Sequence, residues 1–164
     1  MDAVLQVLKN DARTSVEDIA KMTGLSPEEV AERIARFEKE GVIRGYRTLL
    51  NTDRLEGEEE GEGRVTAVIE VRVQPEREGG FDRIARRIAM FPEVTTMHLM
   101  SGKYDLLLFV EGESLRKVAT FVSRRLSTLD GVLSTGTHFM LKTYKEDGVL
   151  LEAEGGDERL QVSP

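Results

Sequence analysis

Apolar residues near the start of the chain recur with the roughly 3.6-residue period of amphipathic helices. This spacing predicts a first helix over residues 3–10. A second helix is expected to begin after Ser15, which can cap it together with Asp18, and to end at Gly24. The residues expected on the buried faces are Val4, Leu5 and Leu8 in the first helix and Ile19, Ala20 and Met22 in the second.

The strongest local signal in the chain is the run Ser-Pro-Glu-Glu at residues 26–29. Ser26 can cap a helix, Pro27 suits its first position because the missing N–H needs no partner there, and Glu29 can complete a capping box. A third helix is therefore expected from Ser26 to Glu40. Its buried stripe should consist of Val30, Ile34 and Phe37. An extended segment should follow, marked by Val42, Ile43, Tyr46 and Leu49.

Three short helices with a glycine in the turn before the last predict a helix-turn-helix, here a winged-type domain over residues 1–54. In this motif the final helix enters the major groove, and its N-terminal residues reach the base edges. Arg33 and Arg36 lie off the apolar stripe and are expected to face outward. Arg44 and Arg47 follow on the extended segment, where they can meet phosphates. The alternative is a small helical bundle with a solvated face.

The first turns of the third helix carry acidic residues, which argues against tight DNA binding. Glu28, Glu29 and Glu32 would repel phosphates, at a cost that salt would screen. Glu29 is explained by its capping role, and a glutamate can accept a hydrogen bond from cytosine N4. The helix therefore predicts either weak DNA binding or binding through several sites in one oligomer.

Strands and helices alternate in the second half of the chain. Strands are expected over residues 65–73, 94–100, 104–110 and 133–144, and helices over 81–91 and 114–126. The order βαββαβ is the ferredoxin-like arrangement, so the chain is expected to be an α+β protein with this domain at residues 64–146. Apolar residues on both faces of the sheet predict that a second subunit covers one face, which makes the protein a homo-oligomer.

Charge is distributed unevenly along the 164 residues, whose formal net charge is −7. Residues 55–63 contain five acids and three glycines, which predicts a solvated linker. Residues 146–164 contain six acids and one arginine, and we expect an acidic tail over residues 147–164. The net charge argues against a protein that coats nucleic acid by bulk electrostatics.

A polar hairpin at residues 101–105 is the candidate ligand site. Ser101, Gly102 and Lys103 connect two strands, so their backbone N–H groups could hold a carboxylate while Asp105 pairs with an amine. The last strand adds the hydroxyl groups of Ser134, Thr135 and Thr137. Together these groups would suit an amino acid zwitterion. The alternative is a polar hairpin whose turn is stabilised by Asp105.

Catalytic, metal and cofactor sites are not expected. The chain has no cysteine, and its two histidines, His98 and His138, lack paired metal-ligand spacing. We find no nucleophile with a neighbouring base, no phosphate-binding loop and no carboxylate pair. No signal peptide precedes the first helix and no apolar run approaches the roughly 18 residues of a membrane span. We therefore expect a cytoplasmic protein that does not enter a membrane.

With both domains assigned, residues 3–149 resemble the Lrp/AsnC (leucine-responsive regulatory protein) family. Separate motifs occur in order and at suitable spacing, which makes the resemblance specific. They are Asn10-Asp-Ala-Arg-Thr14, Ile19-Ala20, Gly24-Leu-Ser-Pro27, Arg33-Ile34, Glu38-Lys-Glu-Gly-Val-Ile-Arg-Gly-Tyr46, Ser101-Gly-Lys-Tyr-Asp-Leu-Leu-Leu108 and Thr135-Gly-Thr137. The acidic linker, which is longer than in other family members, and the tail depart from the family pattern.

The resemblance implies a transcription regulator that binds double-stranded DNA and a small effector, usually an amino acid. The second domain would be a RAM (regulation of amino acid metabolism) domain, through which family members form dimers and higher assemblies such as octamers. Carried over by motif, the DNA-binding residues would include Ser26, Glu29, Arg33 and Arg36. The effector would bind between subunits at Gly102, Tyr104 and Asp105, with Thr135 and Thr137.

Two other functions are compatible with the sequence. The acidic third helix would suit an oligomeric amino acid sensor whose DNA binding is weakened or lost. An enzyme on the same scaffold, similar to the sirohaem decarboxylases, is the other alternative. The chain has no histidine-rich tetrapyrrole motif where Gly45-Tyr46-Arg47 stands, which disfavours the enzyme.

Overall fold

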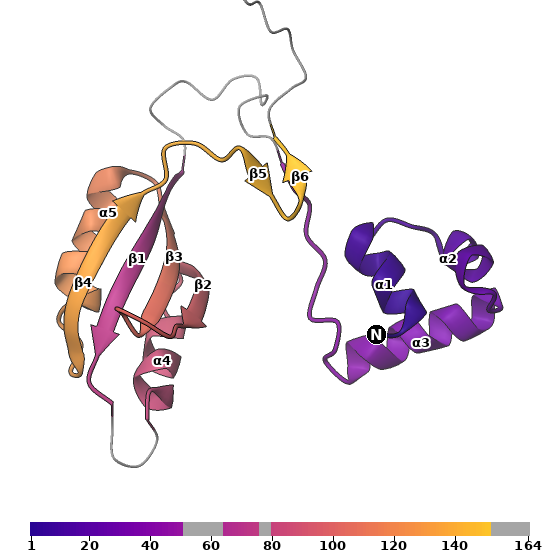
Figure 1. The fold of residues 1–164 in the computed structure, drawn as a ribbon, viewed down its shortest axis with the longest axis horizontal. Helices are drawn as coiled ribbons and strands as arrows, with labels where there is room; N and C mark the ends of the chain where they lie inside the picture. The colour runs from indigo at the N-terminus through magenta and orange to yellow at the C-terminus, as the bar shows by residue number, and fades with distance from the viewer. Residues whose placement is uncertain (51–63, 76–79, 152–164) are drawn as a thin grey trace, which may run out of the picture. The chain divides into compact units, whose positions relative to one another are not determined.

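A computed structural model describes residues 1–50, 64–75 and 80–151 of the chain. The chain divides into two compact units, residues 1–50 and residues 51–164 (Figure 1). The predicted linker at residues 55–63 and most of the predicted tail lie outside the described residues.

The first unit consists of three helices around a small apolar core (Figure 1). They are α1 (Ala3–Asn10), α2 (Val16–Thr23) and α3 (Pro27–Lys39), as the apolar spacing predicts. The buried residues of the core are Val4, Ile19, Ala20 and Val30. Met22 was expected on this buried face but is 68% exposed. The reason is that Val16 and Ala20 lie on one side of Ile19 around the helix and Met22 lies on the other.

A glycine in the left-handed conformation ends α2, and an irregular segment follows α3. Gly24 follows α2 in the left-handed conformation, with a φ of 72°, and its N–H donates to Ala20. After α3, residues 42–50 carry no helix or strand, so no β wing is seen in this part of the described chain. The helix-turn-helix is therefore confirmed as three helices followed by an irregular segment.

The second unit contains a four-stranded antiparallel sheet in the order β2-β3-β1-β4 (Figure 1). The strands are β1 (Val65–Val73), β2 (Val94–Leu99), β3 (Leu106–Gly112) and β4 (Val132–Phe139). The helices are α4 (Asp82–Ala89) and α5 (Leu115–Phe121), and α5 continues into a π-helical turn at Val122–Leu126. This order confirms the ferredoxin-like fold expected from the sequence.

The last predicted strand is too long. β4 ends at Phe139, and a separate two-stranded hairpin follows, formed by β5 (Lys145–Glu146) and β6 (Val149–Leu150). Asp147 and Gly148, between its strands, both have positive φ angles of 45° and 88°. An Asp-Gly pair with two positive φ angles is the usual two-residue hairpin connection.

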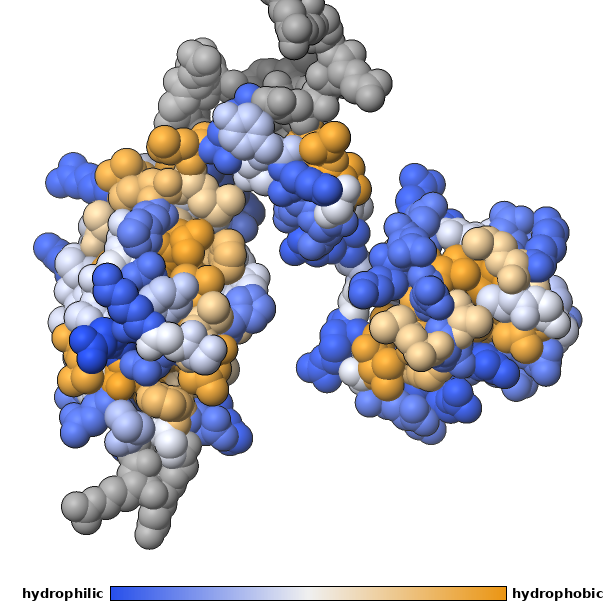
Figure 2. Space-filling model, in the orientation of Figure 1, coloured by the Kyte–Doolittle hydropathy of each residue, from blue (hydrophilic) through white to orange (hydrophobic). Residues whose placement is uncertain are grey.

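The two faces of the sheet differ in burial. Alternate residues of β1 and β3 form the core beneath the helices, namely Ala67, Ile69, Val71, Val73, Leu106, Leu108 and Val110. On the other face Val68 pairs with Phe109, and both are only partly buried. In Figure 2 hydrophobic and hydrophilic residues lie intermixed on the side of the second unit that is shown. The face that carries Val68 and Phe109 is therefore less completely buried than the face packed against the helices.

Candidate functional site

The start of α3 is fixed by reciprocal hydrogen bonds. Ser26 Oγ accepts from the Glu29 N–H at 3.2 Å, and the Glu29 carboxylate accepts from the Ser26 N–H at 2.9 Å. The bond from the Ser26 backbone is the main reason that the pKa of Glu29 is lowered. Ser26 and Glu29, both predicted as DNA-binding residues, are therefore engaged in forming the end of the helix.

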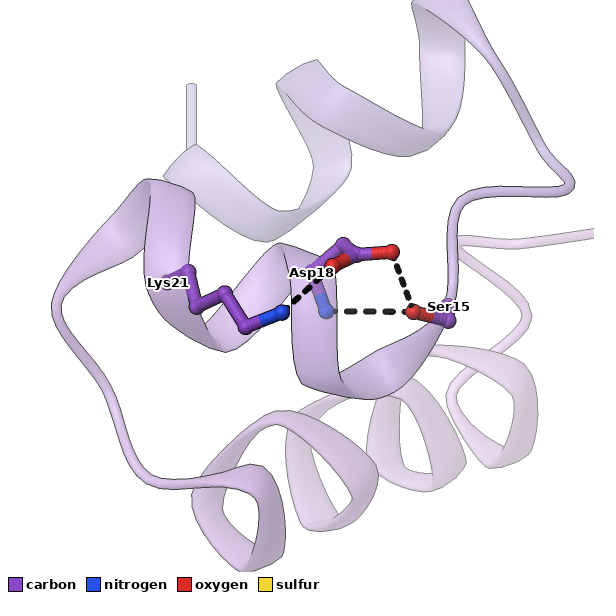
Figure 3. Close-up of polar contacts among 3 residues, drawn as sticks. All are labelled: Ser15, Asp18 and Lys21. Carbon is purple, nitrogen blue, oxygen red and sulfur yellow. Dashed lines mark hydrogen bonds and ion pairs between the residues drawn. The ribbon is translucent and has the colours of Figure 1, made fainter.

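The start of α2 is capped in a similar way (Figure 3). Ser15 Oγ accepts from the Asp18 N–H at 3.1 Å and donates to the Asp18 carboxylate at 2.7 Å. Lys21 Nζ lies 2.9 Å from the same carboxylate, and this hydrogen bond is the main cause of the lowered pKa of Asp18. The contacts stabilise the first turns of α2, the first helix of the helix-turn-helix.

Arg33 does not face outward as expected. Its guanidinium donates to Asp2 Oδ2 at 2.9 Å, and the two side chains are only 38% and 22% exposed. Each residue advances about 100° around a helix, so Arg33 lies about 60° from Val30, at the edge of the buried stripe. Arg33 therefore connects α3 to the start of α1.

Asp2 holds this connection through two hydrogen bonds. Its Oδ1 caps α1 by accepting from the Val4 N–H at 2.9 Å, while Oδ2 accepts from Arg33. Burial alone would raise the pKa of Asp2, but the hydrogen bonds from Val4 and Arg33 and the charge of Arg33 outweigh it, and the pKa is lowered. The carboxylate is thus held in its charged form.

The remaining predicted arginines are exposed. The Arg36 guanidinium lies 5.1 Å from the centre of the Phe37 ring, on the flank of α3. Arg44 and Arg47 lie on the irregular segment after the helix. All three residues are exposed, and their contact with DNA phosphates stays a prediction.

The outer face of α3 is formed mainly by other residues. Glu28, Ala31, Glu32 and Ala35 are all exposed. Glu28 and Glu32 form no hydrogen bond or ion pair with the residues that the structure describes. The acidic surface predicted from the sequence is therefore present, and two of its three carboxylates are not used within the described part of the chain.

In the second unit, the hairpin between β2 and β3 is tied to β1. The Met100 N–H donates to the Asp105 carbonyl at 2.8 Å, and the Asp105 N–H donates to the Val71 carbonyl at 3.0 Å. Asp105 Oδ2 accepts from the Val73 N–H at 2.8 Å. One oxygen of the carboxylate expected to bind an amine therefore holds the hairpin against the end of β1.

A pocket of about 280 Å³ lies beside this hairpin. It brings together four of the residues that the sequence offered for ligand binding, namely Lys103, Tyr104, Ser134 and Thr135. Its other lining residues are Glu70, Arg72 and Gly136. The remaining predicted residues, Ser101, Gly102, Asp105 and Thr137, are not in its lining.

Thr135 and Thr137 were both expected to offer hydroxyl groups to the ligand, but the strand register directs both side chains towards the core side of the sheet. Thr135 pairs with Val71 and Thr137 with Ile69, whose side chains lie in the core beneath the helices. The Thr135 Oγ1 is 3.2 Å from Ser127 Oγ, after the π-helical turn. Their neighbours Ser134 and Gly136 pair with Arg72 and Glu70 on the opposite face of the sheet.

Three charged residues give the pocket its chemistry. Arg72 and Lys103 can bind a carboxylate, and Glu70 can bind an ammonium group. Glu70 Oε1 also lies 3.6 Å from His138 Nε2. Sequence reasoning missed Glu70 and Arg72, although they stand out as charged residues in a strand that otherwise consists mostly of β-branched residues.

A second hollow, of about 420 Å³, is lined by Arg64, which precedes β1, and by Glu111 and Gly112 at the end of β3, among others. Its lining includes Glu93, which forms an ion pair with Arg125. The Arg125 guanidinium also lies 4.6 Å from the centre of the Phe91 ring. None of the predicted ligand-binding residues lines this hollow, so the smaller pocket is the better candidate site.

The described residues contain no group of three or more histidine or acidic residues arranged to hold a metal ion. No helix in the described part of the chain is long and apolar enough to cross a membrane.

Both units match known protein families. Residues 3–38 match the AsnC-type helix-turn-helix domain, and residues 66–150 match the Lrp/AsnC ligand binding domain. An uncharacterized HTH-type transcriptional regulator of Bacillus subtilis, YugG, is 46% identical over 161 residues, which cover 98% of this chain and 95% of YugG. The proline dehydrogenase transcriptional activator of Rhizobium radiobacter is 30% identical, with coverage of 89% and 90%.

Solved structures agree with these matches. A transcriptional regulator of Neisseria meningitidis in complex with L-methionine has a TM-score of 0.66 at 25% identity, covering 88% of this chain and 89% of its own. An AsnC family transcriptional regulator of Agrobacterium tumefaciens has a TM-score of 0.65 at 27% identity, covering 89% and 94%.

Proposed function

Because the chain belongs to the Lrp/AsnC family of transcriptional regulators, we propose that it binds specific DNA sequences and that an amino acid modulates this binding. The observation that carries the proposal is the combination of a helix-turn-helix unit with a pocket that offers opposite charges. The L-methionine bound to the Neisseria relative supports an amino acid as the effector. The same combination favours a regulator over an enzyme. We place this regulator in the cytoplasm, where it would meet its DNA.

The first unit supplies the DNA contacts in this proposal. The capping box of Ser26 and Glu29 positions the start of α3 for the major groove. Arg36, Arg44 and Arg47 are exposed and contact phosphates. The role of Arg33 is revised, because its pairing with Asp2 makes it a positioning residue for α3.

The second unit supplies the effector site. The effector carboxylate binds Arg72 and Lys103, and its ammonium group binds Glu70. Ser101, Gly102 and Asp105 shape the hairpin beside the pocket, and Asp105 does so through its bond to Val73. Thr135 contributes to the pocket wall, while Thr137, on the same core-facing side of β4, is not in the pocket lining.

The protein assembles as a homo-oligomer in this proposal. Val68, Leu107 and Phe109 are only partly buried on the face of the sheet opposite the core. Large apolar residues after β4 are also exposed, including Leu141, Tyr144 and Leu150. Burial of this apolar surface between two copies of the chain would drive association.

The proposal is tested by two measurements on the full chain. Fluorescence polarisation with the promoter of its own gene, at low salt, should show sequence-specific binding. Calorimetry with a panel of amino acids should show binding of at least one of them, and Arg72→Ala should lose it. Arg116→Ala removes a comparable exposed charge on α5 and should leave amino acid binding unchanged.

Two outcomes would contradict the proposal. Amino acid binding without any specific DNA binding would indicate a sensor that has lost the regulator function. Equal amino acid affinities in wild type and Arg72→Ala would show that the effector binds outside this pocket.

A further inference from the structure

The outer face of α3 presents hydrogen-bond acceptors and methyl groups where cationic donors would be usual. Each residue advances about 100° around the axis of α3. Counted from the buried Val30, Glu28 and Glu32 therefore lie about 160° around the helix in opposite directions, and Ala35 lies about 140° around it. All three are exposed, as is Ala31. The face opposite the buried stripe therefore carries two carboxylates in the first two turns of the helix.

The basic residues of α3 lie elsewhere. Arg33 is paired with Asp2 at the edge of the buried stripe, and Arg36 lies on the flank beside Phe37. Lys39 shares the outer face only in the last turn. The N-terminal half of the helix, which reaches base edges in a helix-turn-helix, thus has no outward-facing cation.

Among the acids, Glu28 and Glu32 differ from Glu29. The Glu29 carboxylate is bound to the Ser26 N–H at 2.9 Å. The other two carboxylates form no hydrogen bond or ion pair with described residues. They are therefore available as acceptors for a donor outside the chain.

The base edges of the major groove differ in what they offer to a carboxylate. Cytosine presents the N4 amino donor, whereas guanine presents only the acceptors N7 and O6. Adenine places its N6 donor next to the acceptor N7, which repels a carboxylate. A glutamate on this face consequently favours cytosine. An alanine methyl group, such as that of Ala31 or Ala35, suits contact with the methyl group of thymine.

We infer that Glu28 and Glu32 are specificity-determining residues that select cytosine at two positions of each half-site, within a pyrimidine-rich strand. The inference rests on the proposed function as a sequence-specific DNA-binding protein. The same carboxylates repel phosphates of every duplex. The acidic helix therefore lowers affinity for DNA in general and discriminates strongly against guanine where cytosine is required.

Selection from randomised duplexes tests the inference, using the full chain at low salt. Wild type should enrich cytosine at two positions of each half-site. A glutamine can form two hydrogen bonds with adenine, so Glu28→Gln and Glu32→Gln should each change the preferred base at one of these positions from cytosine to adenine. The ratio of affinities for the two bases should change on the order of 10- to 100-fold.

Glu40→Gln is the matched control. It removes the same charge at the exposed C-terminal end of α3 and should leave the preferred bases unchanged. Since all three glutamates are exposed, each variant should retain the helical circular dichroism of wild type.

Two results would overturn the inference, and they are distinguishable. If both variants bind every duplex more tightly by a similar factor, with the preferred bases unchanged, the carboxylates only repel phosphates. If wild type enriches no sequence at all, the proposed regulator function fails together with the inference.

Discussion

At the scale of single residues, Asp2 connects the first helix to the helix that is expected to enter the groove. Its carboxylate accepts from the Val4 N–H and from the Arg33 guanidinium. Both bonds favour the charged carboxylate, so protonation should weaken them together. The position of α3 relative to α1 should therefore depend on the charge state of Asp2.

Replacement of Asp2 separates its two roles. Asp2→Ala loses the cap and the ion pair, and should destabilise the first unit by about 1 kcal/mol. Asp2→Asn keeps a good capping residue and should lose less. The measurement is amide hydrogen exchange of α1 and α3 in the full chain. Equal exchange rates in wild type and Asp2→Ala at neutral pH would contradict this account.

The pH dependence of the same contact has a defined sign. The folded pKa of Asp2 lies below its ordinary value of 3.8, so the contribution is fully present above that value. It is lost as the pH falls through the folded pKa. The difference in protection between wild type and Asp2→Ala should therefore be large at pH 7 and should disappear in strong acid. A difference that persists there would mean that packing, and not the charge, stabilises the helix.

At the scale of elements, the hairpin between β2 and β3 depends on one glycine. Gly102 has a φ of 139°, which is strained for any residue with a side chain. Gly102→Ala should destabilise the hairpin by roughly 1 to 3 kcal/mol. Protection of the Met100 and Asp105 amides, which hydrogen-bond in this region, should fall accordingly.

Gly45→Ala provides the control for this substitution, because Gly45 has no positive φ and no atom within 4 Å of an added Cβ. It should leave the exchange of the same amides unchanged. Unaltered protection in Gly102→Ala would show that the hairpin accommodates a side chain.

The sequence predicted most elements because their signals are local. Apolar spacing and capping residues located α1, α2 and α3, and the ferredoxin-like order followed from alternating strand and helix patterns. The end of β4 was missed, because Met140, Leu141 and Tyr144 continue the apolar pattern although the pairing with β1 ends at Phe139. The Asp147-Gly148 turn was a local signal that could have identified the β5–β6 hairpin.

The candidate sites were harder to predict, because they depend on contacts between distant residues. The pairing of Arg33 with Asp2 spans 31 positions, and no local pattern indicates it. Asp105 was expected to meet a ligand, but its bond to Val73 is set by how β3 docks against β1. Glu70 and Arg72 join the pocket only through the register of β1 with β4.

At the scale of the whole molecule, the face of the sheet opposite the core should bind a second copy of the chain. Phe109 lies on this face between Val68 and Thr96 of the neighbouring strands. Phe109→Glu would place a charge in the contact and should reduce the oligomer mass measured by sedimentation velocity. Arg116→Glu, on the exposed side of α5, should keep the wild-type mass. An unchanged mass in both variants would exclude this face as the interface.

We expect an amino acid bound in the pocket of the second unit to change the DNA affinity of the first. The direct test is a polarisation titration of the promoter duplex, with and without each amino acid that binds in calorimetry. At least one amino acid should change the dissociation constant of wild type by about 5- to 150-fold. The same amino acid should leave Arg72→Ala unaffected. A dissociation constant that no bound amino acid alters would show that the pocket and the helix-turn-helix are not coupled.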